Sequence, residues 1–185
     1  LRAGDEPVYI GFGSMVSGDM GELAEIIRQA VKLSGVRAVV ALGWGQQEAK
    51  TKDANIFYVK SVPHDWLFPH MAGAVHHGGA GTTATSLRHA LPTLVVPFGG
   101  DQPFWAERVY AAGCGPKAIP RDKLTAENLA EGLRALISNP EYTRNAACIG
   151  EALRNEHGCA NAADLIEKAV WDWENGNPAQ DGTNI

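Results

Sequence analysis

Short apolar runs alternate with stretches of helical periodicity along most of the chain, and this alternation restricts the possible folds more than any other feature. The apolar runs have the length of buried strands, at residues 8–10, 36–42, 56–59, 73–76 and 94–98. Helix-forming patterns lie between and after them, at residues 20–34, 66–70, 82–90, 104–112, 125–138, from 140 onward, and 160–173. Strands that alternate with helices form right-handed crossover units around a parallel sheet. We therefore predict an α/β fold, a Rossmann-like parallel sheet flanked by helices, to which residues 114–119 could add a sixth strand.

Several helix ends carry local signals. Asp19 is suited to an N-cap position, Thr125 with Glu127 suits the start of its helix, and Asp65 could cap the short helix that follows it. Gly35 and Gly113 are good terminators, because glycine readily adopts the left-handed conformation that ends a helix.

The length of 185 residues is enough for one well-buried domain. Residues 1–7 are polar and contain Gly4 and Pro7, so we interpret them as a linker. We expect the folded domain over residues 8–173 and a flexible polar tail over residues 174–185.

Charge and cysteine content exclude several classes of protein. The formal net charge of −5 argues against a broad nucleic-acid footprint. The three cysteines form no CxxC pair, so we expect no disulfide framework and a reducing, cytoplasmic compartment. No apolar run approaches the roughly 18 residues that a transmembrane helix needs.

A glycine-rich turn follows the strand predicted at residues 73–76. Gly78, Gly79 and Gly81 let the backbone turn sharply and approach a ligand closely. The turn leads into a helix, whose N-terminus offers free N–H groups at the positive end of the helix dipole. Together with His77 and the hydroxyls of the threonines that follow, this arrangement predicts a phosphate site.

Asp101 and Gln102 follow the next strand, at the edge of the sheet where open α/β folds bind ligands. A carboxylate beside a phosphate site suits the hydroxyls of a sugar, so the two segments together predict a sugar attached to a phosphate. Asp101 could also cap the helix that starts near Pro103. Trp105 could line the sugar pocket or seal the core.

Other nucleotide-binding motifs fail. Gly11 and Gly13 follow the first strand, but the third glycine position of a dinucleotide fingerprint holds Val16, and the second strand ends at Leu42 without a carboxylate for a ribose. No Walker sequence, DxD pair, HExxH or Cys/His cluster occurs. We therefore expect no metal and no cofactor, with the diphosphate charge met by N–H groups, a helix dipole, His77 and hydroxyls.

Two segments, residues 77–83 (HGGAGTT) and residues 97–102 (PFGGDQ), resemble the donor-binding signature of family 1 UDP-sugar glycosyltransferases. Residues 62–69 (VPHDWLFP) and 86–93 (SLRHALPT) look most like the sterol 3-beta-glucosyltransferase branch. The resemblance covers about residues 8–170. It implies the C-terminal half of a two-domain GT-B enzyme, the half that binds the nucleotide sugar.

The resemblance also implies a function. The domain would bind UDP-glucose for an inverting transfer to a hydroxyl of a sterol or similar lipophilic acceptor. The family's catalytic base, a His oriented by an Asp, belongs to an N-terminal acceptor domain, so no catalytic residue is expected in this chain. Membrane contact would be made through the rest of the parent protein, and the isolated half could self-associate. The alternatives are a non-catalytic UDP-sugar-binding subunit with a separate acceptor-domain partner, and a phosphate-binding regulatory domain that takes no sugar.

The roles implied for single residues run from the base to the sugar. Trp44 would flank the uracil and the Val62 backbone would bond it. Contacts with the diphosphate would come from Ser14, His77, Gly79, Gly81, Thr82 and Thr83. Asp101 and Gln102 would bond the glucose hydroxyls. Plant members carry a Glu for the ribose where this chain has Thr85, so ribose recognition must differ. His76 would face away from His77 in a strand and is interpreted as structural.

Overall fold

The computed structural model describes residues 4–13, 20–41 and 53–176. The chain divides into two compact units, residues 1–153 and residues 154–185, and each is described by itself. The first unit holds the sheet and the helices that cover it. The described part of the second contains the end of α6 (Pro140–Asn155) and α7 (Gly158–Glu174).

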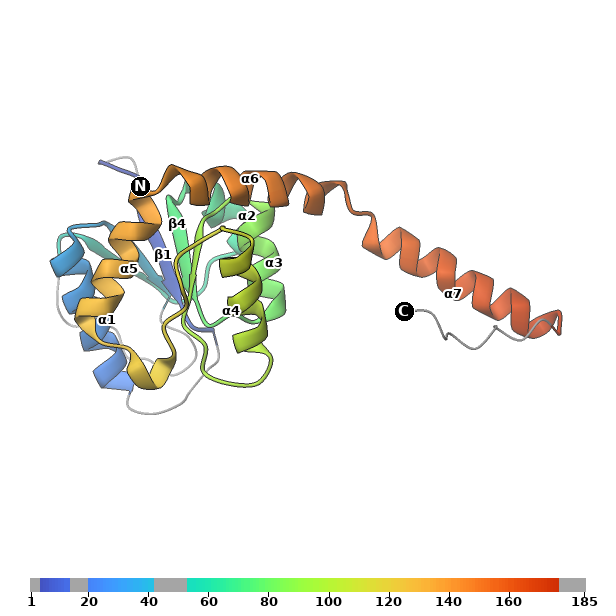
Figure 1. Ribbon diagram of the computed structural model, residues 1–185, viewed down its shortest axis with the longest axis horizontal. Helices are drawn as coiled ribbons and strands as arrows, with labels where there is room; N and C mark the ends of the chain where they lie inside the picture. The colour runs from blue at the N-terminus through green and yellow to red at the C-terminus, as the bar shows by residue number, and fades with distance from the viewer. Residues whose placement is uncertain (1–3, 14–19, 42–52, 177–185) are drawn as a thin grey trace. The chain divides into compact units, whose positions relative to one another are not determined.

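The described strands form one parallel five-stranded sheet, as the alternation of strands and helices predicts (Figure 1). Its order is β3-β2-β1-β4-β5, so the chain starts in the middle and crosses to each side in turn. The strands are β1 (Val8–Gly11), β2 (Ala38–Ala41), β3 (Ile56–Val59), β4 (Gly73–His76) and β5 (Thr93–Val95). Because all pairs are parallel, every strand presents its carboxyl end at the same edge.

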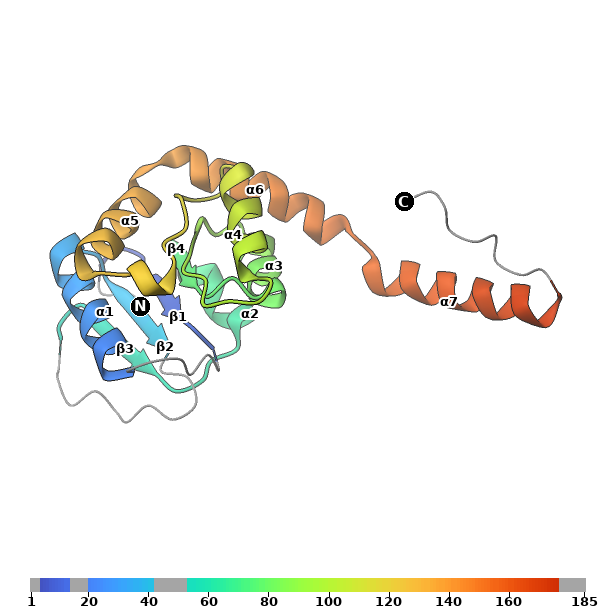
Figure 2. The ribbon, with the colours of Figure 1, turned by 60° about the horizontal axis from the view of Figure 1, so that its bottom comes forward.

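The remaining helices of the first unit cover the two faces of this sheet (Figure 2). They are α1 (Met20–Ser34), α2 (His64–Leu67), η1 (Phe68–His70), α3 (Ala80–Arg88), α4 (Gln102–Ala111), η2 (Arg121–Lys123) and α5 (Ala126–Ser138). Helices α1 and α5 lie side by side on one face, and α2 and α3 cover the other (Figures 1 and 2).

Some local expectations are wrong. Residues 114–119 form no strand, although Cys114 and Ile119 each share a backbone hydrogen bond with β5. Helices α3 and α4 each begin two residues earlier than predicted. Asp65 does not cap α2 but lies in its first turn, where its Oδ1 is 3.0 Å from His89 Nε2. The predicted cap of α1 at Asp19 lies outside the described residues.

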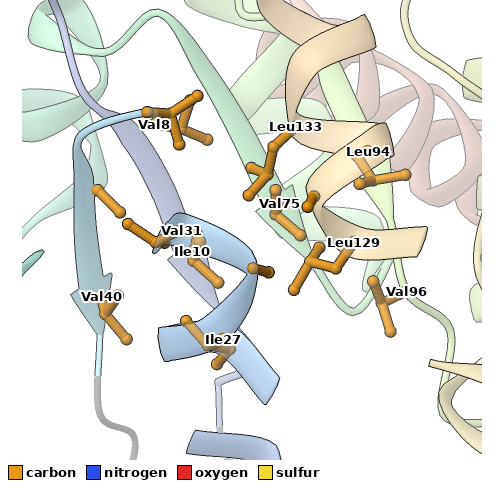
Figure 3. Packing of buried hydrophobic residues seen from close by; sticks show 14 of the residues in the cluster. Val8, Ile10, Ile27, Val31, Val40, Val75, Leu94, Val96, Leu129 and Leu133 are labelled. Carbon is orange, nitrogen blue, oxygen red and sulfur yellow. The ribbon is translucent and has the colours of Figure 1, made fainter. Parts of the chain in front are cut away.

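The main core lies between the sheet and the α1–α5 layer (Figure 3). It is built from aliphatic side chains: Val8, Ile10, Ile27, Val31, Val40, Val75, Leu94, Val96, Leu129 and Leu133. Gly132 allows α5 to approach closely, because a Cβ there would come within 2.7 Å of Leu94 Cδ2. A capping box starts α5, in which Thr125 pairs with Asn128. This packing makes the sheet a rigid platform for its carboxyl edge.

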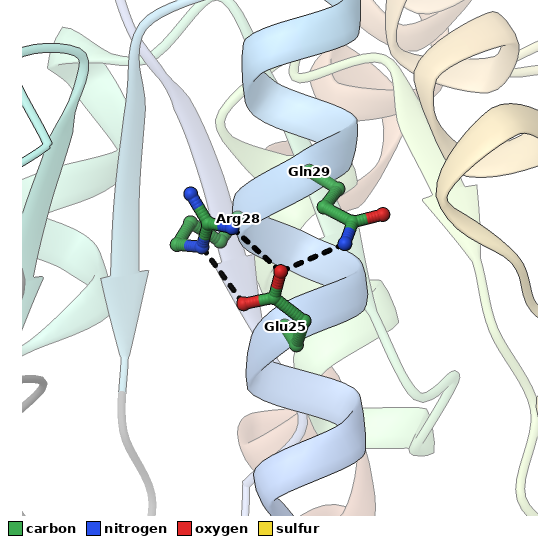
Figure 4. A network of polar contacts seen from close by, with 3 residues as sticks. All are labelled: Glu25, Arg28 and Gln29. Atoms are coloured by element: carbon green, nitrogen blue, oxygen red, sulfur yellow. Dashed lines mark hydrogen bonds and ion pairs between the residues drawn. The ribbon is translucent and has the colours of Figure 1, made fainter.

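On the solvent side of α1, Glu25 accepts hydrogen bonds from Arg28 and Gln29 (Figure 4). These hydrogen bonds lower the pKa of Glu25 to about 2, and the bond from Arg28 has the largest effect. The group is fully solvated, so such a surface network adds little to stability.

Candidate functional site

Three segments meet where β1, β4 and β5 end, and their close approach depends on glycine. A Cβ at Gly13, after β1, would lie 3.3 Å from the His77 ring. One at Gly78, after β4, would lie 2.6 Å from a methyl carbon of Val95 and 3.2 Å from the Gln102 carbonyl oxygen. The structure thus brings the glycine-rich turn and the segment before α4 together at the carboxyl edge.

His77 is half-buried in this edge. Its Nδ1 is shielded from solvent and has no hydrogen-bond partner among the residues that the structure describes. A buried nitrogen without a hydrogen-bond partner lowers the stability of the fold by about 1–3 kcal/mol, and a hydrogen bond to a ligand atom could recover this energy. Burial lowers the pKa of His77, and the nearby Asp101 carboxylate partly opposes that effect. The ring is therefore mainly neutral at pH 7, and it lies within electrostatic range of Asp101.

The start of α3 lies directly beside the His77 ring. Gly79 is the N-cap residue, and no side chain caps the helix there. The first N–H groups of α3, from Ala80 onward, have no carbonyl partner within the helix, so they can meet an anion. The Thr83 hydroxyl is buried and donates to the Gly79 carbonyl oxygen over 3.0 Å. Gly81 is exposed and Thr82 half-buried, so these two are more open to a ligand than Thr83.

Asp101 and Gln102 stand at the start of α4 but face different surroundings. Asp101 occupies the N-cap position without making a cap bond, and instead its Oδ2 accepts from the Trp105 indole N–H over 2.8 Å. The Asp101 side chain is exposed and held by Trp105. Gln102 is buried, and its Oε1 accepts from the backbone N–H groups of Phe98 and Gly99, over 2.7 and 3.2 Å. Direct contact of either side chain with a sugar stays a prediction.

The residues assigned to the base lie apart from this cluster. Val62 follows β3, and the strands β2 and β1 separate β3 from β4 in the sheet. At about 4.8 Å per strand, the ends of β3 and β4 are roughly 14 Å apart, so only an extended ligand could touch both. Ser14 and Trp44 lie outside the described residues, and their roles stay predictions.

Two polar contacts near the site have no counterpart in the sequence-based predictions. The Tyr9 hydroxyl is 3.0 Å from His64 Nε2, and the His64 ring stacks on Phe68. This pair supports the loop that carries Val62. In the sequence, the one indication of this contact was a tyrosine in an otherwise aliphatic strand. His76 is fully buried and contacts Gly78 and Ser86.

Within the ranges that the structure describes, no helix is long and apolar enough to cross a bilayer. No group of three or more His, Cys, Asp or Glu side chains among those same residues could hold a metal ion.

Residues 25–166 match the model of a family described as "Erythromycin biosynthesis protein CIII-like, C-terminal domain". This match covers well over half of the chain. The chain belongs to this family. The predicted membership in the family 1 glycosyltransferases, as their C-terminal domain, is therefore confirmed.

The curated proteins that are similar to this chain include sterol 3-beta-glucosyltransferases. The sterol 3-beta-glucosyltransferase UGT80B1 of Arabidopsis thaliana is 43% identical over 170 residues, which cover 91% of this chain and 28% of that protein. The sterol 3-beta-glucosyltransferase of Pichia angusta is 40% identical over 171 residues, covering 89% of this chain and 14% of that protein. The chain thus spans less than a third of the length of these relatives.

Solved structures give the fold. The glycotransferase of kitacinnamycin superposes with a TM-score of 0.74 at 25% identity, over 91% of this chain and 44% of its own. The calicheamicin glycosyltransferase CalG4 gives a TM-score of 0.76 at 21% identity, over 90% and 44%. VinC, solved in complex with DTDP, gives 0.69 at 27% identity, over 83% and 39%. The predicted GT-B fold is confirmed, and the family member corresponds to its C-terminal half.

Proposed function

We propose that this domain binds UDP-glucose as the donor half of an inverting glucosyltransferase whose acceptor is a sterol or a similar lipophilic alcohol. One observation carries the proposal: the His77 ring, whose buried Nδ1 has no hydrogen-bond partner among the described residues, lies beside the start of α3, where no side chain caps the helix. A neutral donor next to free N–H groups suits a diphosphate. The names of the sterol glucosyltransferase relatives support the acceptor class.

In this reaction the oxygen of the acceptor hydroxyl attacks the anomeric carbon, and the bond from that carbon to the β-phosphate oxygen breaks. UDP leaves with added negative charge, and the hydroxyl proton passes to a base supplied outside this chain. His77 and the N–H groups of α3 would stabilise the charge where it develops. The exposed Asp101 carboxylate, held by Trp105, would accept hydrogen bonds from sugar hydroxyls. We assign no metal to this step.

The proposal places the domain in the cytoplasm, where its three free cysteines fit a reducing environment, with any membrane contact made by the rest of the parent protein. The rival reading, a non-catalytic UDP-sugar-binding subunit, predicts a stable separate partner that carries the base and co-purifies with a chain of this length. A regulatory phosphate-binding domain predicts equal affinity for UDP and UDP-glucose.

Calorimetric titration of this chain with UDP and with UDP-glucose tests the proposal. We expect His77→Ala to weaken binding by about 1.5–3 kcal/mol, or roughly tenfold or more in Kd. His70→Ala is the matched control, because His70 is exposed and precedes β4, at the opposite edge of the sheet. Wild-type chain that binds neither ligand at millimolar concentration, or equal Kd values for wild type and His77→Ala, would reject the proposal.

A further inference from the structure

His76 is the last residue of β4 and lies where the strand meets the glycine-rich turn. Its side chain is fully buried, although it is a polar imidazole. Its Nδ1 is 3.0 Å from the Gly78 backbone nitrogen, and its Nε2 is 3.3 Å from Ser86 Oγ. Both ring nitrogens are therefore satisfied inside the protein.

These contacts determine the tautomer of the ring. A backbone N–H can only donate, so His76 Nδ1 must be the acceptor and the single ring proton must be on Nε2. Nε2 then donates to Ser86 Oγ, and the Ser86 hydroxyl donates to the Thr83 carbonyl oxygen over 3.0 Å. The Thr93 hydroxyl lies 3.1 Å from Ser86 Oγ, so one network joins β4, α3 and β5.

The bond to Gly78 has a consequence for the turn. Gly78 adopts φ +89°, a left-handed conformation, and its N–H points into the protein toward His76 instead of outward. The next residue, Gly79, returns to an extended conformation and occupies the N-cap position of α3. One buried hydrogen bond, from Gly78 to His76, thus helps to fix the backbone between β4 and α3. The direction of the His77 ring depends on the same stretch of backbone.

We propose that His76 is a positioning residue for the donor phosphates: by holding the Gly78 N–H inward, it aims the His77 ring and the N-terminus of α3 at the diphosphate. This inference rests on the proposed function for its ligand. It goes beyond that function because His76 itself touches no ligand.

The environment of His76 keeps it in the required neutral state. Burial lowers its pKa to about 3, and the rings of His77 and His64 oppose its protonation further. The acceptor at Nδ1 is therefore present throughout the neutral and mildly acidic range.

Two substitutions separate the two ends of the ring. His76→Asn places an amide oxygen near the position of Nδ1, so the acceptor for Gly78 is kept and the bond to Ser86 is lost. His76→Gln reaches the position of Nε2, so the bond to Ser86 is kept and the acceptor for Gly78 is lost. The variants are matched in chemistry, and a purely structural role predicts that each weakens UDP binding only in proportion to its loss of Tm.

The experiment measures three quantities on wild type and both variants: the Kd for UDP by calorimetry, Tm, and hydrogen exchange of the Gly78 amide by NMR. We expect a protected Gly78 amide and a Kd within about threefold of wild type for His76→Asn. For His76→Gln we expect a rapidly exchanging amide and a Kd at least about tenfold weaker, at a similar Tm.

The outcomes are distinguishable. An unprotected Gly78 amide in the wild type, or equal Kd values for the two variants, would overturn the positioning role. Wild-type chain that binds no UDP would reject the proposed function and with it the phosphate role. The exchange measurement would still decide separately whether His76 holds the turn.

Discussion

The substitution Gly79→Ala tests the geometry of the site most sharply. A Cβ at Gly79 would lie 2.6 Å from His77 Nε2, well inside van der Waals contact. The backbone itself tolerates alanine, because Gly79 has φ −61° and ψ 140°. The added methyl group therefore acts on the His77 ring and on little else.

The size of the effect follows from the distance. An ordinary contact needs about 3.4 Å, so the ring nitrogen must move by roughly 0.8 Å. The ring can turn aside at small cost in stability, because it is a half-buried side chain and not backbone. Misplacement of a positioned group by about 1 Å can cost up to about 10²-fold in function. We expect UDP affinity to fall at least about tenfold, with a change in unfolding free energy below about 1 kcal/mol.

Gly81→Ala is a comparison variant on the same helix, at a position that is also predicted to contact the diphosphate. A Cβ there meets nothing within 4 Å, and alanine favours a helix over glycine by about 0.5–1 kcal/mol. Calorimetry with UDP and urea denaturation of both variants give the result. If Gly79→Ala binds UDP as wild type does, the position of the His77 ring does not matter and our reasoning is refuted. A loss of affinity in Gly81→Ala at raised stability would show that the ligand itself approaches Gly81.

Three further predictions concern stability and the sugar. The pKa of His76 falls from 6.5 in the unfolded chain to about 3 in the folded state, so the unfolded chain binds the proton more readily. The free energy of unfolding should therefore be highest above pH 6.5 and decline as the pH falls toward 3, and the decline should be shallower in His76→Asn. Identical slopes for wild type and variant would contradict this. Leu133→Ala should cost about 2–5 kcal/mol in urea denaturation, since Leu133 is fully buried in the α5 layer, and a loss below 1 kcal/mol would argue against that packing. Trp105→Phe removes the donor to Asp101 and should weaken UDP-glucose binding several-fold while leaving UDP unchanged; calorimetry showing equal losses would exclude a sugar-specific role.

The fold class could be predicted because apolar runs and helical periodicity are local signals. The helix at residues 20–34 was predicted with the bounds it has in the structure, since its apolar residues repeat regularly and Gly35 ends it. The strand expected at residues 114–119 does not form. A Cβ at Gly115 would lie 1.8 Å from the Thr93 carbonyl oxygen, so this segment runs alongside β5 at a distance that only a glycine allows. Such an approach depends on the tertiary structure, which a pattern of residue types does not contain.

The site was predictable only in part for a similar reason. His77 and the glycines stand together in the sequence, so their shared location followed from a strand, a turn and a helix. The role of His76 depends on Ser86 and Thr93. Ser86 is 10 residues from His76 in the sequence and 7 residues from Thr93, and the three side chains meet only after β4, α3 and β5 have packed. Whether Gln102 faces a ligand or the protein likewise depends on the course of the loop before it.

The Gln102 side chain has a consequence for how the donor would bind. Its Oε1 accepts hydrogen bonds from the backbone N–H groups of Phe98 and Gly99, so residues 98–102 are held together by bonds within the segment itself. A preorganised loop loses little conformational entropy when a sugar arrives, and less of the contact energy is then spent on ordering. Under the proposed function, this domain should therefore show measurable donor affinity by itself, and a separate acceptor domain would be needed for the chemistry more than for shaping the donor site.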